Sequence, residues 1–559
     1  MEPRLRRVFS WEASLSLNIT RRTALAAGLA AGASARALTQ PSSGTTWESL
    51  ARDYQTPDWF RDAKFGIWSH WGPQCQPENG DWYARKMYMQ ARDAWDQGET
   101  AYQHHLRVYG HPSETGFIDI IGKWKAERWD PAYLLRRFQK AGARYFMAMA
   151  NHHDNLDLFA SKHHTWNSVR VGPKRDIIGT WEKLVRQTDL KFAVSNHSSH
   201  AWHWWQTAYG YDAEGPMKGR RYDAYWLRKH HGKGKFWEGL DPQDLYTGPT
   251  YVPPKGIPTA KAMNEWHGKR DDQWFEDVPP ERRWFAEQWV LRQNDLVDQY
   301  KPDMVYFDDT AIPFGQQGLD TVAQFYARQV EWHGRNQGVI TAKHLSPLQK
   351  RAIVADVERS FVAGIQPQPW QTDTCIGSWH YDRRHYENDS YKSAKDVIQR
   401  LADVISKNGN LMLNIPMRGD GSIDDKEEKV IDGITAWFAV NSPAVYGTRP
   451  WRRFGEGPTK PPTGTMAEGQ AKPFVAEDVR FTTKGGELFA FFMEWPKGEA
   501  VMNSLGHTAL AGGRVERIAL LGGGPVAFRQ DADALRLTVP QRSDTGIVPV
   551  LRIQGSGLV

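Results

Sequence analysis

The sequence places residues capable of nucleophilic or acid–base chemistry shortly after apolar runs. Asp308 follows the run MVYF, and His152 and His153 follow the run YFMAMA. A carboxylate in such a position can act as a nucleophile or a base, or it can cap a following helix. Of the two adjacent aspartates, Asp309 fits the capping role better, which leaves Asp308 as the candidate for chemistry.

Cleavage of a glycosidic bond needs a second carboxyl group. One group attacks the sugar or activates water, while the other protonates the leaving oxygen. The segment 355–382 offers Asp356, Glu358 and Asp373 for this role. Glu358 precedes Arg359, which favours the charged carboxylate if the two side chains touch. A surface ion pair is the alternative explanation for Glu358.

The adjacent histidines favour sugar binding over metal binding. On an extended segment, the side chains of His152 and His153 point to opposite sides, so we expect that one metal ion does not take both. Imidazole can donate to and accept from substrate hydroxyls. Histidine pairs also occur at 104–105, 163–164 and 230–231, so pairing alone carries little information. No cysteine spacing of a metal site is present, and no cofactor is expected.

Apolar runs alternate along the chain with stretches whose apolar residues recur three or four positions apart, which predicts strands alternating with helices. This order, with polar residues at strand ends, is typical of a (β/α)₈ barrel. A doubly wound sheet is the main alternative, but no Gly-rich phosphate turn follows a strand. The strand segments are 63–72, 143–154, 190–200, 302–310, 338–344 and 409–416, and the clearest helices are 131–141, 281–300 and 392–406.

Composition divides the chain into a catalytic region and a second domain. Residues 38–452 are predicted to form the barrel, with a polar, poorly periodic insertion at about 210–280 that we expect to cover its mouth. The Pro/Gly-rich stretch 453–470 is predicted to be a linker. Short alternating runs separated by turn residues predict a C-terminal antiparallel β-sandwich at 471–559.

Residues 1–37 have the features of an export signal, with Arg21 and Arg22 before a weakly apolar stretch that ends in A-x-A at Ala35–Ala37. We expect twin-arginine export to the periplasm or the medium; a disordered basic tail is the alternative. Six arginines and two glutamates give this segment +4 of the formal net charge of +6. The remainder is nearly neutral, so nucleic acid is not expected as a partner.

Three further features of the composition concern the folded protein. No later segment approaches the ~20 apolar residues of a membrane span, so no span is expected. Cys75 and Cys375 are expected to be unpaired thiols, with one disulfide as the alternative in an oxidising compartment. The 26 tryptophans suit stacking on sugar rings, although large cores also use this residue.

Five motifs, in order from about residue 57 to 452, resemble those of the α-L-fucosidases of glycoside hydrolase family 29. FGIWSHWG resembles the first-strand motif, MANHHDNLDLF with GPKRDIIG resembles the family's K-H-H-D block, and YKPDMVYFDD resembles its nucleophile strand. NGNLMLNIP and VNSPAVYG resemble the end of the catalytic domain. The resemblance implies a retaining hydrolase that acts on fucosylated oligosaccharides or glycoconjugates through a covalent fucosyl-enzyme.

The resemblance also implies roles for individual residues. Asp308 matches the nucleophile, and Glu358 is expected to be the acid/base because it lies before the W-Q-T-D motif. Fucose carries a C6 methyl group, so an apolar wall is expected beside the hydroxyl-binding groups; its candidates are Trp82, Tyr306, Trp370 and Trp379. The full set of expected substrate contacts is His70, Asp81, Trp82, His152, His153, His197, Tyr306, Trp370 and Asp373.

The chain departs from the family pattern at several positions. Asn151 and Asn155 replace the Lys and Gly around the H-H-D motif, and Asp309 replaces Gly after the nucleophile. The usual Tyr after the third strand is absent, so His197 is expected to take over its polar contact. Two other functions stay open: a sugar-binding protein without catalysis, and a metal-dependent barrel hydrolase, for which an H-x-H motif after the first strand is missing.

Overall fold

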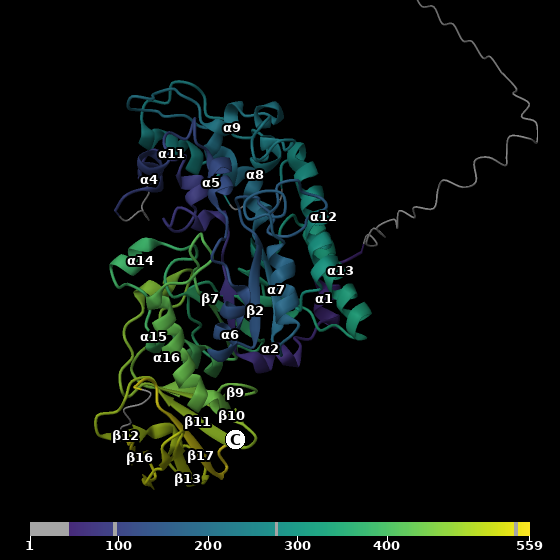
Figure 1. The fold of residues 1–559 in the computed structure, drawn as a ribbon. Helices are drawn as coiled ribbons and strands as arrows, with labels where there is room; N and C mark the ends of the chain where they lie inside the picture. Colours follow the sequence, from purple (N-terminus) through teal and green to yellow (C-terminus); the bar gives the residue numbers. More distant parts are fainter. Residues whose placement is uncertain (1–43, 93–97, 274–277, 541–545) are drawn as a thin grey trace, which may run out of the picture. The chain divides into compact units, whose positions relative to one another are not determined.

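The structure, a computed structural model, describes residues 44–92, 98–273, 278–540 and 546–559. Within these ranges, eight parallel strands close a barrel in chain order, which confirms the predicted fold (Figure 1). The expected export signal at 1–37 lies outside the described residues. The barrel strands are β1 (Phe65–Ser69), β2 (Tyr145–Asn151), β3 (Lys191–Asn196), β4 (Met304–Thr310), β5 (Val339–Lys343), β6 (Val354–Asp356), β7 (Trp370–Cys375) and β8 (Gly409–Asn414).

Alternate residues of each strand point to opposite sides of the barrel wall. Trp68, Tyr145 and Tyr306 belong to one buried cluster that fills the barrel interior. Gly66 leaves room for the Tyr145 ring, because an added Cβ would lie 2.5 Å from it. Asp308 follows Tyr306 by two positions, so it lies on the same inward face at the carboxyl end of β4. The strand period therefore aims the candidate nucleophile into the barrel mouth.

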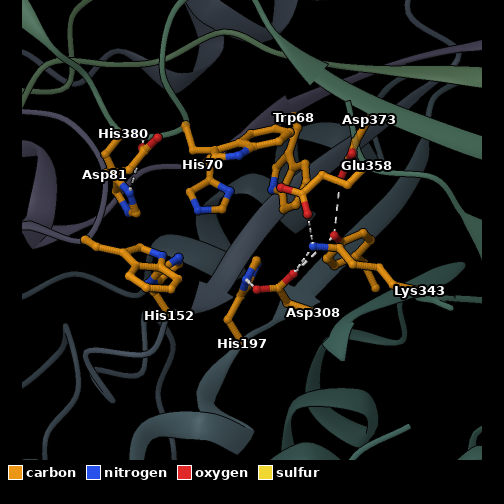
Figure 2. A pocket seen from close by; sticks show the side chains of 13 residues that line it. Trp68, His70, Asp81, His152, His197, Asp308, Lys343, Glu358, Asp373 and His380 are labelled. Atoms are coloured by element: carbon orange, nitrogen blue, oxygen red, sulfur yellow. Dashed lines mark hydrogen bonds and ion pairs between the residues drawn. The ribbon is translucent and has the colours of Figure 1, made fainter. Parts of the chain in front are cut away.

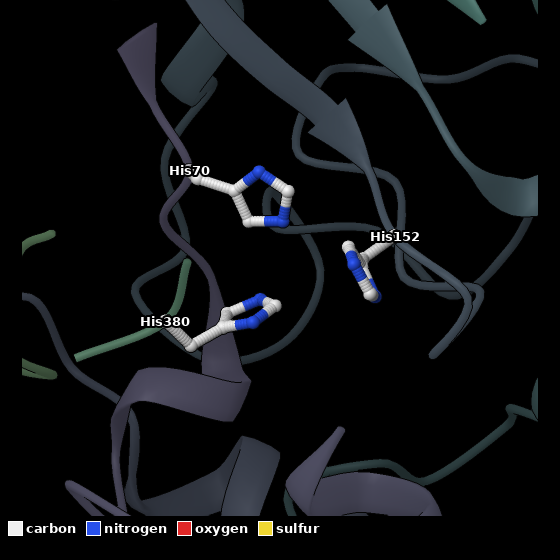
Figure 3. A group of neighbouring side chains, drawn as sticks. All are labelled: His70, His152 and His380. Atoms are coloured by element: carbon white, nitrogen blue, oxygen red, sulfur yellow. The ribbon is translucent and has the colours of Figure 1, made fainter. Parts of the chain in front are cut away.

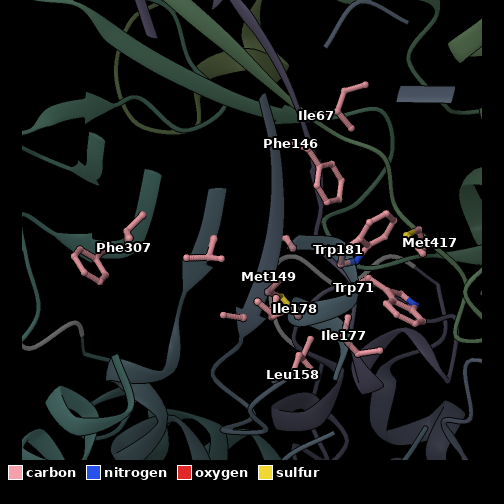
Figure 4. Close-up of a cluster of buried hydrophobic side chains, with 14 of the residues drawn as sticks. Ile67, Trp71, Phe146, Met149, Leu158, Ile177, Ile178, Trp181, Phe307 and Met417 are labelled. Atoms are coloured by element: carbon pink, nitrogen blue, oxygen red, sulfur yellow. The ribbon is translucent and has the colours of Figure 1, made fainter. Parts of the chain in front are cut away.

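The outward-facing residues form a second, larger cluster with the surrounding helices (Figure 4). Phe146 of β2, for example, packs on Trp181 at a ring-centroid distance of 4.6 Å. Each such buried side chain contributes about 1.5–3 kcal/mol, so this layer holds the strands in place. The main helices around the barrel are α6 (Pro131–Lys140), α7 (Ile177–Val185), α12 (Arg283–Tyr300), α13 (Gln316–His333), α15 (Ala394–Ser406) and α16 (Asp425–Asn441).

Capping side chains fix where several of these helices begin. Asp130 accepts a hydrogen bond from the backbone N–H of Tyr133 at 2.9 Å, and Pro131 follows it at the first helical position. Ser393 and Asp396 form a reciprocal capping box at the start of α15. Such caps satisfy N–H groups that have no partner within the helix. Shorter helices are α1 (Trp47–Asp53), α2 (Asp58–Ala63), α3 (Tyr83–Lys86) and α14 (Arg383–Glu387).

The predicted insertion at about 210–280 lies between β3 and β4 and is anchored by buried polar contacts. Arg85 and Asp271 form an ion pair at 2.6 Å, and Asp223 accepts hydrogen bonds from Tyr88 and Tyr246. The insertion therefore packs on the segment that follows β1, and Figure 1 groups their helices together. The helices of the insertion are α9 (Asp223–Trp226), α10 (Pro242–Leu245) and α11 (Ala260–Gly268), and α8 (Ala201–Trp204) precedes them; α4 (Ala101–Val108) and α5 (Phe117–Lys123) belong to the segment after β1.

The C-terminal region forms, within the described residues, a six-stranded and a three-stranded antiparallel sheet. Residues of both sheets, such as Phe481 and Leu537, share one core cluster, as expected for two packed sheets. The strands are β9 (Arg449–Glu456), β10 (Val479–Lys484), β11 (Glu487–Phe492), β12 (Glu499–Met502), β13 (Arg514–Leu520), β14 (Gly524–Pro525), β15 (Phe528–Gln530), β16 (Leu535–Thr538) and β17 (Val550–Ser556).

The expected linker at 453–470 begins inside a strand. β9 is the last strand in the order of the six-stranded sheet, and an edge strand tolerates residues such as Pro450 that a central strand excludes. At its other end, Ala467–Gln470 forms a short 3₁₀ helix, η8, whose first residue is buried. The stretch is therefore an ordered connection, although its composition is that of a linker.

Candidate active site

A pocket opens at the carboxyl ends of the barrel strands (Figure 2). Strands β1 to β7 each contribute a side chain from their last residues or from the residues just after them, which is where barrels carry their active sites. The pocket is lined by Trp68, His70, Asp81, Trp82, His152, His197, Tyr306, Asp308, Lys343, Glu358, Asp373, Trp379 and His380.

Lys343 joins two carboxylates on one side of this pocket. Its Nζ lies 2.5 Å from Oδ1 of Asp308 and also donates to Oε2 of Glu358. The nearest oxygens of Asp308 and Glu358 therefore lie within two hydrogen-bond lengths, about 5 Å, of each other. All three side chains are at most 20% exposed. We call Asp308, Lys343 and Glu358 the charged wall of the pocket.

The charged wall keeps its nucleophile candidate ionised. Burial raises the pKa of Asp308, but the Lys343 ammonium, together with His153 and His197, outweighs burial and holds that pKa well below its usual range. Burial likewise lowers the pKa of Lys343, yet Asp308 and Glu358 hold it well above its usual range. At neutral pH the pair is thus a carboxylate and an ammonium, and the carboxylate is the form that can attack carbon.

Two histidines face the second oxygen of Asp308. His197 Nδ1 lies 3.2 Å and His153 Nε2 lies 3.3 Å from Oδ2. The hydroxyl of Ser195, 3.1 Å from His197 Nε2, can donate to that nitrogen, which leaves the Nδ1 proton of His197 for Asp308. His153 donates from Nδ1 to the carbonyl of His197 at 2.6 Å, and its pKa of about 4 keeps the ring neutral, so its Nε2 carries no proton. His197 is therefore the histidine that can donate to Asp308.

The opposite side of the pocket carries three histidines that converge on one another (Figure 3). Burial, with the neighbouring imidazoles, holds the pKa of His70 and His152 well below the usual range, and burial also lowers the pKa of His380. These rings are therefore neutral at pH 7. Gln74 contacts His152 Nδ1 at 2.9 Å, and Asp81 accepts from the backbone N–H of His380 at 2.7 Å.

We call His70, His152 and His380 the imidazole wall. Neither ring nitrogen of His70 has a hydrogen-bond partner within the described residues, so both can serve a ligand. One nitrogen from each of the three rings lies within 4.8 Å of the others, a spacing that could also hold a metal ion. Neutral imidazoles that donate and accept are equally suited to sugar hydroxyls.

The prediction that His152 and His153 point to opposite sides is wrong. Strand β2 ends at Asn151, so both histidines lie beyond the strand, and His153 already belongs to the turn that follows it. Their ring centroids lie 4.4 Å apart, and both residues lie near His197. The adjacency of the two rings is therefore a property of the turn after β2 and not of a strand.

Two further aspartates behind the charged wall are buried without a cation of their own. Burial, reinforced by Glu358, raises the pKa of Asp373 to about 7, and the hydroxyl of Tyr306 donates to Asp373 at 3.1 Å. Burial, reinforced by Asp373, holds the pKa of Asp356 well above its usual range, and Gln371 donates to it at 2.7 Å. The barrel thus keeps protonatable carboxyls next to ionised ones.

Most expected site residues line this pocket, but the expected substrate contacts His153 and Trp370 are not among its lining residues, and the expected cap at Asp309 also needs correction. Trp370 is the first residue of β7, and its indole donates to the carbonyl of Lys407 at the amino end of the barrel, away from the pocket. Asp309 is not a helix cap, because α13 begins only at Gln316. Asp309 instead accepts hydrogen bonds from Ser199 at 3.0 Å and lies 2.8 Å from His200.

The structure adds three residues that the sequence did not single out. Lys343 ends β5, so its position after an apolar run was a usable signal. Trp68 lies two residues before His70, and the period of two on a strand could have indicated that both face inward. His380 lies in the loop after β7, where no pattern marks it. These residues complete the charged wall, the apolar wall and the imidazole wall.

Two features away from the pocket match their expectations. Cys75 and Cys375, both described, are buried unpaired thiols. Across the part of the chain that the structure describes, no helix combines the length and apolar character that a membrane crossing requires.

Comparison with known proteins agrees with the geometry. The family model for α-L-fucosidase matches residues 30–443, and a model for the α-L-fucosidase C-terminal domain matches residues 471–554. An α-L-fucosidase of Branchiostoma floridae is 24% identical, over 82% of this chain and 83% of its own length. Plasma α-L-fucosidase of Homo sapiens is also 24% identical, over 86% of this chain and 84% of its own length.

Solved structures share the fold. The α-fucosidase of Thermotoga maritima superposes with a TM-score of 0.63 at 24% identity, over 91% of this chain and 99% of that one. The likeness covers both the barrel and the C-terminal domain. The family model alone spans most of the chain, from before β1 to the end of α16. The chain therefore belongs to the α-L-fucosidase family and is a glycoside hydrolase.

Proposed function

We propose that this protein is a retaining exo-α-L-fucosidase that forms a fucosyl-enzyme on Asp308 and uses Glu358 as acid/base. The observation that carries the proposal is the shared contact of both carboxylates with Lys343, which limits their separation to about 5 Å. Retaining enzymes hold their carboxyl groups ~5–5.5 Å apart, whereas inverting enzymes need room for a water between them.

The reaction proceeds in two displacements. An Asp308 oxygen bonds to the anomeric carbon as its bond to the leaving oxygen breaks, and Glu358 gives a proton to that oxygen. Glu358 then takes a proton from water, whose oxygen bonds to the anomeric carbon and releases Asp308. Entry of the sugar ring between the carboxylates replaces the Lys343–Glu358 contact, so that Glu358 is free to carry its proton.

Recognition of fucose is divided between polar and apolar side chains. The imidazole wall offers donors and acceptors to the ring hydroxyls, while Trp68, Tyr306 and Trp379 offer an apolar surface to the C6 methyl. The structurally similar Thermotoga maritima α-fucosidase has been solved in complex with fucose and with a mechanism-based inhibitor. We infer that the partner of this protein is a terminal fucose on an oligosaccharide or glycoconjugate.

Chemical rescue tests the assignment of the two carboxylates. In Glu358→Ala, azide should attack the fucosyl-enzyme and yield α-fucosyl azide, whereas in Asp308→Gly it should attack the substrate directly and yield the β-anomer. The anomer is read by NMR of the isolated product. Undiminished hydrolysis by Asp308→Gly would exclude the nucleophile, and binding of fucose without turnover of any fucoside by the unaltered protein would favour a sugar-binding function.

Export and the insertion complete the proposal. Residues 1–37 are proposed as a twin-arginine signal; replacing Arg21 and Arg22 together by Lys should retain activity in the cytoplasmic fraction of the producing cell. We further propose that the insertion at about 210–280 shapes the leaving-group side of the pocket, because its Asp271 pairs at 2.6 Å with Arg85, three residues after the pocket residue Trp82. Trimming the insertion should then change the ratio of the kcat/KM values that the enzyme shows on fucosides of different linkage.

A further inference from the structure

The chain between the barrel and the C-terminal sheets returns to the loop that carries Glu358. Thr463 forms a parallel bridge with Phe361, and the backbone N–H of Glu468 donates to the carbonyl of Arg359 at 2.8 Å. The short helix η8 begins one residue earlier, at the buried Ala467. The segment 463–468 therefore lies along the loop 357–361 and is not a free tether.

The side chain of Glu468 is built into this contact. Its carboxylate accepts hydrogen bonds from Oγ1 of Thr374 at 2.9 and 3.0 Å, from Nζ of Lys392 at 2.9 Å and from Nε of Arg359 at 3.4 Å. It is only 13% exposed. Burial raises the pKa of Glu468, but Lys392 and Arg400 outweigh burial and lower it. Glu468 is thus an ionised, multiply bonded group.

The partners of Glu468 are the immediate neighbours of pocket carboxyls. Arg359 follows Glu358, and Thr374 follows Asp373. The backbone N–H of Arg359 also donates to the carbonyl of Asp373 at 3.0 Å, which ties the loop to β7. Glu468 therefore binds both loop 357–361 and strand β7. Its contacts are with the residues that directly follow the carboxyl-bearing Glu358 and Asp373.

The loop needs such support. Arg359 has a φ of +42°, in the left-handed region that residues with a Cβ occupy at a cost of roughly 1–2 kcal/mol. A backbone in this state persists only where the surroundings over-determine it. The amide and carbonyl of Arg359 are bonded to Asp373 and Glu468, and its side chain contacts Glu468. This backbone turn immediately follows Glu358, the partner of Lys343.

We propose that Glu468 is a positioning residue for the acid/base: it holds loop 357–361 so that the Glu358 carboxyl faces the leaving oxygen. This inference rests on the proposed role of Glu358. Glu468 itself lies outside the pocket lining and acts through its neighbours. An ordered segment beyond the barrel thereby takes part in leaving-group protonation.

The test compares Glu468→Gln with Glu494→Gln in the full chain. Glu494 is a matched control, because it pairs with Lys395, three residues after the Glu468 partner Lys392. Glu494 makes no described contact with loop 357–361. The readout is kcat/KM on two aryl fucosides. A dinitrophenolate leaves without a proton, whereas a phenolate needs the acid.

Glu468→Gln should lose about 10- to 100-fold on the phenyl fucoside, a part of what a general acid supplies, and under about 3-fold on the dinitrophenyl fucoside. The control should lose under about 3-fold on both substrates. Equal losses on the two substrates, or no loss on the phenyl fucoside, would overturn the inference. If Glu468→Gln does not fold, Thr374→Val removes the hydroxyl whose single proton the two Glu468 oxygens share, and it should give the same selective loss, reduced to about 3- to 10-fold.

Adding Glu468→Gln to Glu358→Ala separates this inference from the proposed function. If Glu468 acts through Glu358, the second substitution should cost under about 2-fold in that background, because coupled sites are not additive. A full additional loss would overturn the inference. If Glu358→Ala itself showed no dependence on the leaving group, the acid/base assignment would fall, and the positioning role with it.

Discussion

The charged wall and the imidazole wall of the pocket hold opposite ionisation states: the side chains of the charged wall are 12–20% exposed, and the residues of the imidazole wall are at most 3% exposed. Asp308 and Lys343 stay charged because each is the other's counter-ion. His70 and His152 stay neutral because burial lowers their pKa and the neighbouring imidazoles lower it further. Burial thus opposes charge on both walls, and only the charged wall contains counter-ions that outweigh it. The charged wall suits bond breaking, and the neutral wall suits recognition of hydroxyls.

The largest effect should come from removing the nucleophile. Asp308→Gly should lower kcat by about 10⁴-fold or more, because no other described group reaches the same position in the charged wall. Steady-state kinetics on an aryl fucoside measure it. Asp309→Asn is the matched control, since Asp309 contacts Ser199 and His200 and lies outside the pocket lining. A similar loss in both variants would contradict the distinction between the two aspartates.

Lys343→Met should break the charged wall without removing either carboxylate. The two carboxylates then repel each other, the pKa of Asp308 rises, and the ionised nucleophile is lost at higher pH than before. We expect kcat/KM to fall by about 10²- to 10³-fold and the acidic limb of its pH profile to move upward. Lys343→Arg keeps the charge and should preserve the limb. An unmoved limb in the Met variant would show that Lys343 does not set the ionisation of Asp308.

His70→Ala tests whether the imidazole wall binds substrate hydroxyls without affecting the ionisation of the charged wall. Loss of a hydroxyl partner should lower kcat/KM by about 10- to 100-fold and leave the pH profile in place. Monodeoxy fucosides identify the partner: the variant and the unaltered protein should differ little on the sugar that lacks the contacted hydroxyl. Equal losses on every deoxy sugar would mean that His70 supports the pocket without binding a hydroxyl.

Asp373→Asn should change stability more than chemistry. The pKa of Asp373 is about 7 in the folded protein and ~3.9 when unfolded, so its protonated form is the one that folding favours. This contribution is complete below about pH 4 and is lost as the pH rises through about 7. Asn mimics the neutral acid, so the variant should gain relative stability over that interval. Urea unfolding at several pH values between about 4 and 7 measures this difference in the free energy of unfolding. If the difference between the variant and the unaltered protein did not change with pH, the raised pKa of Asp373 would be refuted.

Chelation should have the smallest effect. If the imidazole wall binds hydroxyls, prolonged treatment with EDTA should leave kcat/KM unchanged, since no described step needs a metal ion. Activity measured before and after buffer exchange checks this. Loss of activity that returns on addition of Zn²⁺ would instead assign the three rings to a metal site and favour the metal-dependent alternative.

The sequence was sufficient to predict a strand where an apolar run ends in a polar side chain of the site. Six of the eight described barrel strands are apolar runs, and Asp308 could be placed from the end of one of them. Strands β6 and β7 were missed because β6 has three residues and β7, WQTDTC, is polar along its pocket face. Strands that line a site carry polar residues at buried positions, so periodicity fails where function is concentrated.

Individual side chains were harder to place than elements. Trp370 shares the aromatic character of the true wall residues, but it begins a strand, and only the direction of the strand tells which end meets the sugar. His380 lies after β7, so no expected strand preceded it. The turn after β2 brings His152 and His153 together, and adjacent letters alone do not define a turn.

The segment 463–468 has a consequence for how this protein can be divided. A chain shortened to residues 1–452 would keep every barrel strand and every residue that lines the pocket. It would nevertheless lack Glu468, and with it the contacts that hold loop 357–361. Such a truncation should lose activity on fucosides with poor leaving groups, and it would also remove Phe491 and Val550 from the large buried cluster that surrounds the barrel. The residues that line the pocket and the residues that support its acid/base loop thus end at different points along the chain.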